Sequence, residues 1–324
     1  MAKTVLAMAT SHSPGLNNPV ERWFTRADAD RRHLETTGLA DYEQLAREKA
    51  SWIGAEITEE KLRERYAACQ QAISTLQETL ARVQPQVVIV VGDDHREVFS
   101  SEHMPAFNVH WADSVFVPPF PRGRDQASGG AGRSPDGDGT HIYPVDADLG
   151  RHLVHALTAE QFDVSYTRTV SELKGLGHSF DFVCRRIMSG TVVPQVPFLL
   201  NTYYPPNRPT AKRCYDLGKA LRRSVDSWES DKTVAIIGSG GLSHHVVDEG
   251  VDRAILAGME HKSEDELTCY PESLFVDGTS EIKAWIVVGG FMAEDERQMR
   301  LVSYNPCYRS PAGTGVGNAF AYWE

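Results

Sequence analysis

The stretch Val234-Ala235-Ile236-Ile237-Gly238-Ser239-Gly240-Gly241-Leu242-Ser243-His244-His245 decides the fold class of this chain. Its first four residues form a short apolar run that predicts a buried strand, and the glycines after them predict a turn. An ionisable side chain just beyond a strand and a glycine turn is typical of α/β proteins, which present chemistry at the carboxyl ends of their strands. The stretch alone is compatible with a phosphate-binding loop, a proton-transfer loop, or a tight turn beside two ordinary histidines.

Two further apolar runs end in a histidine in the same way. Residues 4–9 precede His12, and residues 87–91 precede His95. If the three strands lie in one sheet, their carboxyl ends bring His12, His95 and His244 to one edge. A lone histidine after a strand is more often structural than functional, but three at matching strand ends indicate a site.

Strand and helix patterns alternate along the whole chain, which predicts an α/β fold. We expect a single domain over residues 1–324, with a mixed central sheet flanked by helices and the active site at the carboxyl ends of the strands. The other expected strands are 105–110, 162–170, 196–203, 299–304 and 316–322, and the expected helices are 146–157, 179–188, 209–228, 251–259 and 281–288. Residues 27–83 form a polar, helical insertion, which we interpret as a cap or a subunit contact. Residues 118–140 are rich in Gly and Pro and predict a lid, a binding loop or disorder.

Composition excludes several classes of protein. The net charge of -11 over 324 residues argues against a nucleic-acid or anionic-membrane partner, since these need clustered Lys and Arg. No apolar run approaches the ~20 residues of a membrane span, and the apolar start is too short for a signal peptide. Five scattered cysteines without a C-x-x-C pair suggest reduced thiols in the cytoplasm and no thiolate zinc site.

The candidate ligand types favour certain metals. Imidazoles without thiolates suit zinc, iron or copper, and one added carboxylate suits Fe(II), with open positions for substrate and dioxygen. The chain has 44 acidic residues, so composition alone does not single out that carboxylate.

Four motifs occur along the chain in a fixed order. They are Ser11-His12-Ser13-Pro14, Gly92-Asp93-Asp94-His95, Gly238-Ser239-Gly240-Gly241-Leu242-Ser243-His244 and Ser280-Glu281-Ile282-Lys283-Ala284-Trp285. Each is weak alone, but in this order and spacing they resemble the LigB-type (class III) extradiol ring-cleavage dioxygenases. That family includes the catalytic subunit of protocatechuate 4,5-dioxygenase, gallate dioxygenases and 2,3-dihydroxyphenylpropionate 1,2-dioxygenase. The resemblance extends from His12 to about Trp285, with a weaker echo at 313–320.

The resemblance implies roles for five residues. The metal ligands of the family fall on His12, His95 and Glu281, and its acid/base histidine falls on His244. A further active-site histidine falls on His178, although this match is the loosest, because the family often has Asp-His-Gly where this chain has Gly-His-Ser. Without the resemblance, Glu281 would be read as a first-turn helix carboxylate favoured by the helix dipole.

The implied activity is extradiol cleavage of a catecholic ring by O2 at a mononuclear non-haem Fe(II). The expected substrate is of the protocatechuate, gallate or O-methylated gallate type, and homo-oligomers are the habit of the family. Catechol must lose protons on binding and the departing oxygen must gain one, and an imidazole near neutral pH can do both. We therefore expect His244 to be the principal acid/base and His178 to position oxygen or share proton transfer. His245 should point to the other side of a strand-like backbone.

Residue-level alternatives remain open at this point. Arg122, Arg124 and Arg133 of the Gly/Pro-rich loop could bind a substrate carboxylate, although arginines in such a loop are more often solvated. The glycines of residues 238–241 are expected to let the chain turn closely past a bound substrate.

Three other functions compete with the dioxygenase. A dinucleotide-dependent oxidoreductase is weakly supported, because Ser243 stands where the third glycine of that fingerprint belongs. A zinc-dependent hydrolase could use the same His/His/Glu set. A non-catalytic relative is disfavoured, because all three ligand positions and both further histidines are retained.

Overall fold

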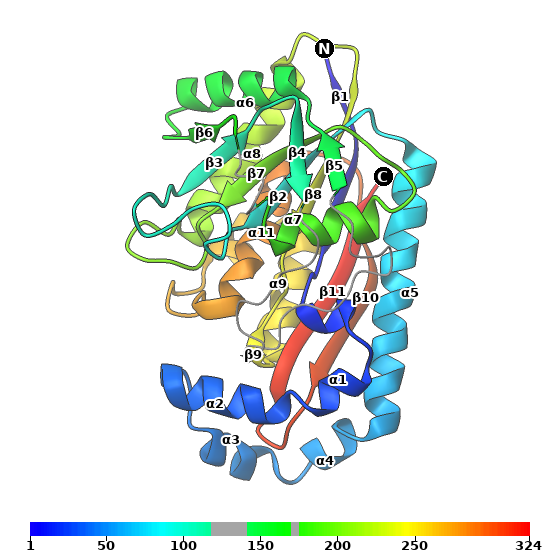
Figure 1. Cartoon of the computed structure of the whole chain (residues 1–324), viewed down its shortest axis with the longest axis vertical. Helices are drawn as coiled ribbons and strands as arrows, with labels where there is room; N and C mark the ends of the chain where they lie inside the picture. The colour runs from blue at the N-terminus through cyan, green and yellow to red at the C-terminus, as the bar shows by residue number, and fades with distance from the viewer. Residues whose placement is uncertain (118–140, 170–174) are drawn as a thin grey trace.

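The computed structural model describes residues 1–117, 141–169 and 175–324, and its centre is a nine-stranded mixed sheet with helices on both faces (Figure 1). Four neighbouring strands run parallel in the middle of the sheet. In spatial order they are β1 (Lys3–Thr10), β8 (Thr233–Ser239), β2 (Val87–Asp93) and β7 (Gln195–Leu200). The predicted α/β class with a mixed central sheet is confirmed.

Antiparallel strands extend the sheet on both sides. Beyond β1 lie β11 (Thr314–Trp323) and β10 (Arg300–Tyr308), and the short β9 (His244–Val246) pairs with the start of β11. Beyond β7 lie β3 (Phe107–His110), antiparallel to β7, and β6 (Ser165–Thr167), parallel to β3. A separate hairpin joins β4 (Ser114–Val117) to β5 (His141–Pro144).

Helices cover both faces of the sheet, and each face has its own apolar core. One core contains side chains of α6 (Ala147–Ala159), α8 (Ala211–Ser227), α9 (Glu249–His261), α10 (Glu264–Thr268) and α11 (Ile282–Phe291). The other contains side chains of α5 (Glu59–Val83), α7 (His178–Phe182) and the following π-helix Val183–Ile187. Strand β2 contributes Val87, Ile89 and Val91 to the first core and Val88 and Val90 to the second, as the two-residue period of a doubly covered strand requires.

Side-chain caps fix where four of the longer helices begin. In each, a Thr or Asp just before the helix accepts a hydrogen bond from a backbone N–H in the first turn. The capping residues are Thr58 for α5, Asp146 for α6, Thr210 for α8 and Asp248 for α9.

The predicted helical insertion at residues 27–83 divides into four helices with different positions. The bounds are α2 (Ala27–Thr37), α3 (Tyr42–Lys49), α4 (Ile53–Glu56) and α5; the 3-10 turn Pro14–Asn17 and α1 (Glu21–Phe24) precede them. The long α5 is part of a core layer, whereas α2, α3 and α4 lie together beyond the ends of β9 and β11 (Figure 1). Only these three are therefore an addition to the layered fold.

Several expected boundaries differ from the structure. The strand expected at 162–170 is limited to β6 among its described residues, because it pairs with only one neighbour. Glu281 closes the 3-10 turn η3 (Asp277–Glu281) instead of lying inside the helix that follows. Strands β4, β5 and β9 and helix α10 were not expected. The predicted loop at 118–140, with its three arginines, lies outside the described residues.

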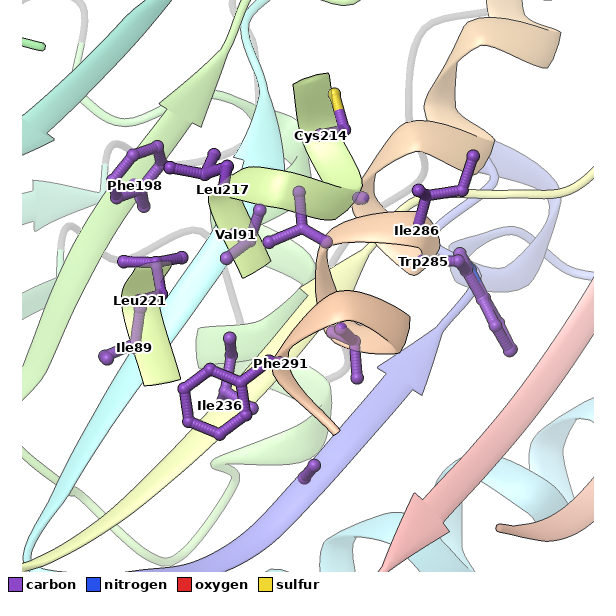
Figure 2. Packing of buried hydrophobic residues seen from close by; sticks show 14 of the residues in the cluster. Ile89, Val91, Phe198, Cys214, Leu217, Leu221, Ile236, Trp285, Ile286 and Phe291 are labelled. Atoms are coloured by element: carbon purple, nitrogen blue, oxygen red, sulfur yellow. The ribbon is translucent and has the colours of Figure 1, made fainter. Parts of the chain in front are cut away.

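Helix α11 is the centre of the first core. All ten of its residues are buried, and nine of them are apolar; the exception, Lys283, is paired with Glu272 at 2.8 Å. Trp285, Ile286 and Phe291 pack there with side chains of α8 and the sheet, including Leu217 and Leu221 (Figure 2). In residues 1–117, 141–169 and 175–324, no helix has both the length and the apolar character needed to span a membrane.

Replacing Gly290 by alanine should destabilise the protein strongly. A Cβ at this position of α11 would lie 2.0 Å from the backbone oxygen of Tyr215 in α8, so the two helices would have to separate. Overpacking of this kind costs about 1–3 kcal/mol of unfolding free energy, which denaturant titration measures. Gly54→Ala is the matched control, because a Cβ there meets no atom within 4 Å. Equal stability of the two variants would contradict the close helix contact.

Candidate active site

The carboxyl ends of three parallel strands converge on one cavity. Strand β8 lies between β1 and β2, with Thr10 level with Ser239 and Val91 level with Gly238, so the loops after the three strands are neighbours. The cavity has a volume of about 680 Å³. All five residues that the sequence analysis singled out line it, namely His12, His95, His178, His244 and Glu281.

His12 is held in a single tautomer with one nitrogen directed at carboxylates. Its Nδ1 lies 3.0 Å from the Ser239 hydroxyl, which itself donates to the Ser179 carbonyl, so Nδ1 must carry the proton and donate. The lone pair is therefore on Nε2, which is buried, has no hydrogen-bond partner, and lies 3.3 Å from Glu281 Oε2. A nitrogen fixed in this way has the arrangement expected of a metal-binding imidazole.

Glu281 occupies the centre of the candidate metal site. Its Oε2 accepts a hydrogen bond of 2.7 Å from the Gly241 N–H and lies 3.4 Å from His244 Nε2. Burial alone would raise the pKa of Glu281, but attraction to the protonated forms of His244 and His12 holds it well below its usual value. The carboxylate is therefore ionised and available to a cation.

Asp93, which sequence reasoning did not single out, lies beside these ligands. It is the last residue of β2 and is buried, with Oδ1 3.9 Å from His12 Nε2 and Oδ2 2.6 Å from His95 Nε2. Burial would raise the pKa of Asp93, but His95 lowers it to about 2. One ligand atom from each of His12, Asp93, His178 and Glu281 falls within a span of 4.8 Å, and these donors fit a cation such as Fe(II) or Zn²⁺. His95 adjoins this group through Asp93.

His178 is bound by a second residue that sequence reasoning missed. Its Nδ1 lies 2.5 Å from Glu97 Oε1, and its backbone N–H donates to the same oxygen. Burial would lower the pKa of His178, but the Glu97 carboxylate raises it to about 10. The ring lies 4.8 Å from that of His12 and 4.6 Å from that of His95, so a protonated His178 stands beside both candidate ligands.

His244 has the opposite electrostatic environment. Its Nδ1–H donates to the Leu242 carbonyl at 2.9 Å, which leaves the lone pair on the Nε2 atom that faces Glu281. Burial lowers the pKa of His244, and the attraction of Glu281 only partly offsets it. The chain therefore places a neutral imidazole and a protonated one around one cavity, an arrangement suited to base and acid roles.

The glycine turn serves the site's own side chains. A Cβ on Gly241 would lie 2.1 Å from Cε1 of His244, so only glycine leaves room for this ring. The N–H of Gly241 also binds the Glu281 carboxylate, so the turn passes close to the candidate metal site.

His245 belongs to a separate group in the same cavity. Its ring stacks on that of His33 from α2, with centroids 3.9 Å apart and planes 17° apart. Both Nε2 atoms bind Asp277, at 3.0 and 2.9 Å. Two imidazoles that ligate one ion direct their lone pairs at one point, and nearly parallel rings do not, so this group is a hydrogen-bonded cluster and not a second metal site. Of the two adjacent histidines, only His244 faces Glu281, although both line the same cavity.

Comparison with known proteins places this architecture in a family. Residues 55–315 match the family model described as the catalytic LigB subunit of aromatic ring-opening dioxygenase. A gallate dioxygenase of Pseudomonas putida is 39% identical over 106 residues, which cover 32% of this chain and 30% of that protein. A 2,3-dihydroxyphenylpropionate/2,3-dihydroxicinnamic acid 1,2-dioxygenase of Rhodococcus sp is 31% identical over 159 residues, which cover 47% of each chain. The matched stretches thus span less than half of these relatives.

Proposed function

Because the chain belongs to the family of catalytic LigB subunits of aromatic ring-opening dioxygenases, we propose that it opens a catecholic ring with O2 in the extradiol manner, using a single Fe(II). One observation carries the proposal: the lone pair of His12 Nε2 is buried without a hydrogen-bond partner, 3.3 Å from the ionised Glu281 carboxylate. An unpartnered buried nitrogen beside a carboxylate is costly unless a cation binds both.

His12, His95 and Glu281 are the residues that would hold the metal. Two imidazoles and one carboxylate suit Fe(II), which when bound would supply open positions for the catechol and for dioxygen. Asp93 would orient His95, since its Oδ2 lies 2.6 Å from His95 Nε2. Neighbouring carboxylates that orient ligand imidazoles are usual around metals.

Proton transfer would fall to His244 and His178. His244 presents an unprotonated Nε2 to the cavity, so it can accept the proton that a catechol hydroxyl loses on binding. His178, protonated through its contact with Glu97, can donate a hydrogen bond to a developing negative charge on oxygen. His244 then holds the proton that the departing oxygen needs.

The cavity wall supports a catecholic acid as the substrate. The cavity is lined by Arg26, Arg32 and Arg309, and because Arg309 already binds Asp30 there, Arg32 is the arginine that we assign to a substrate carboxylate. Guanidinium groups bind carboxylates through paired, charge-assisted hydrogen bonds. A substrate of the protocatechuate, gallate or O-methylated gallate type would carry such a group. The cytoplasm and a homo-oligomeric state remain predictions from the sequence and the family.

The direct test is ring opening under defined metal loading. The protein is purified without oxygen, loaded with Fe(II), mixed with a panel of catechols and gallates, and exposed to air. We expect oxygen uptake and a yellow ring-opened product with at least one catecholic acid. Tight zinc binding with no oxygen uptake on any compound would overturn the proposal and favour a zinc-dependent hydrolase.

A further inference from the structure

Asp277 gathers hydrogen-bond donors from three distant parts of the chain. His33 of α2 binds its Oδ2 at 2.9 Å, His245 of β9 binds its Oδ1 at 3.0 Å, and the Tyr203 hydroxyl, beyond β7, donates to Oδ1. The Gly278 N–H adds a fourth bond, of 2.8 Å. Only 12% of the Asp277 side chain is exposed. This one carboxylate therefore links three segments of the chain that surround the cavity.

The backbone at Asp277 connects this cluster to the candidate metal site. Asp277 has a φ of 50°, in the left-handed region that Asp and Asn tolerate better than most residues. It opens the 3-10 turn η3, whose last residue is Glu281. A short turn with one end tied to several donors leaves its other end little freedom, so Asp277 constrains the position of Glu281.

Tyr203 connects Asp277 to a candidate metal ligand. The Tyr203 ring packs against the His95 ring with centroids 4.5 Å apart, and its hydroxyl is fixed on Asp277. Burial and the neighbouring carboxylate both raise the pKa of Tyr203, so the hydroxyl remains a donor. The Tyr203 ring therefore limits the positions that the His95 imidazole can take, and the bond to Asp277 fixes the position of the Tyr203 ring.

His33 connects Asp277 to the helical cover of the cavity. Seven residues of the α2 region line the cavity, at positions 26, 29, 30, 32, 33, 36 and 37, and most of them share one helical face. Between this face and η3, His33 supplies both a hydrogen bond to Asp277 and a stacking contact with His245. Loss of the bond would leave α2 less firmly placed over the substrate.

We propose that Asp277 is a positioning residue that sets His95 for metal binding through Tyr203 and holds α2 over the substrate through His33. The inference rests on the proposed function, since it takes His95 as a metal ligand and a catechol as the substrate. It goes further by giving two residues outside the family motifs, Asp277 and Tyr203, an effect on metal affinity.

The proposed effect of Asp277 on metal binding is tested by Fe(II) affinity, measured without oxygen against a competing chelator. Asp277→Asn keeps the shape and the backbone tolerance but removes the charge, and Tyr203→Phe keeps the ring but removes the hydroxyl. Each should weaken Fe(II) binding by about 10-fold or more, as is usual when a partner that orients a ligand is lost. The double variant should bind no more weakly than Asp277→Asn alone, because both changes break one connection.

Tyr308→Phe is the matched control for the Fe(II)-affinity experiment. It removes a hydroxyl that donates to a carboxylate, that of Glu249, at 2.9 Å, from a tyrosine that does not line the cavity. It should leave Fe(II) affinity unchanged. Wild-type affinity in Tyr203→Phe, or additive losses in the double variant, would overturn the connection through Tyr203. If Asp277→Asn fails to fold, Tyr203→Phe alone decides.

The proposed effect of Asp277 on substrate binding is tested by His33→Phe. This variant retains a ring to stack on His245 but cannot donate to Asp277. We expect an unchanged Fe(II) affinity and kcat, with KM for the catechol raised several-fold, the pattern of lost substrate binding. An unchanged KM would overturn the proposed role of the His33–Asp277 bond in substrate binding. Metal affinity needs no turnover, so a protein that binds Fe(II) as described but opens no ring would contradict the proposed function and leave the role of Asp277 in metal binding intact.

Discussion

Replacing Glu281 by glutamine should reduce Fe(II) affinity by more than about 100-fold, because loss of residues that merely support a ligand already costs 10–100-fold. The side chain is nearly inaccessible, with 4% exposed, and its Oε2 lies within 3.4 Å of both His12 Nε2 and His244 Nε2. The neutral amide fills the same volume and its oxygen can still accept from the Gly241 N–H, so the change removes mainly the charge. Metal content after anaerobic loading and gel filtration measures the effect.

Glu266→Gln is the matched control for this change. Glu266 also accepts a contact from an imidazole, His261, at 2.9 Å, but this pair lies on the surface. The Glu266→Gln variant should bind Fe(II) as tightly as the unaltered protein does. Thermal unfolding without metal should be similar for Glu281→Gln and the unaltered chain. Full metal loading of Glu281→Gln would exclude Glu281 as a ligand and favour Asp93, which belongs to the same candidate metal site and whose Oδ1 lies 3.9 Å from His12 Nε2.

The layers of the fold were accessible to sequence reasoning because apolar runs dominate the central strands. Strands β1, β2 and β8 are each largely or wholly buried, and such strands appear as unbroken apolar stretches. The convergence of three histidines followed from parallel pairing alone. The hairpin of β4 and β5 was missed because its strands have four residues each and flank a long polar segment, so neither gives a clear periodic signal.

The carboxylates around the histidines were harder to find. Asp93 belongs to a motif that was noted for His95, but its role depends on which face of β2 it points to, and a strand buried on both sides gives no such signal. Glu97 lies two residues beyond His95 and binds His178, 81 residues further along the chain. Sequence spacing carries no information about such a contact.

The position of α2 could not be predicted for a related reason. Its polar composition is compatible with a cap, a subunit contact or a solvated helix. The contacts that decide between these are long-range, between His33 and Asp277 and between Asp30 and Arg309, which lie 244 and 279 residues apart. Pairings between such distant polar residues follow from the complete fold and not from local pattern.

Replacing His244 by alanine should leave metal binding intact and lower turnover by about 10²–10⁴-fold, the usual contribution of a general acid/base. His244 contacts Glu281 only at 3.4 Å, and the carboxylate keeps its Gly241 bond and its neighbour His12 when the ring is removed. Metal content and the rate of oxygen uptake are measured on the same sample. Added imidazole should restore part of the rate, since the change leaves a space of the same shape beside Gly241.

A control variant and the metal content of His244→Ala distinguish loss of proton transfer from structural damage. His261→Ala removes an exposed imidazole that is paired with Glu266 on the surface, and it should retain both metal and turnover. Loss of metal in His244→Ala would show that the ring supports the ligands instead of moving protons. Unchanged turnover would exclude His244 as the acid/base and leave that role to His178. The Glu97 carboxylate raises the pKa of His178 to about 10, so this imidazole is suited to donate a proton but not to accept one from the catechol. Because the two imidazoles have opposite protonation before the substrate binds, a single-histidine mechanism would need His178 to lose its proton first, and the Glu97 carboxylate opposes that step.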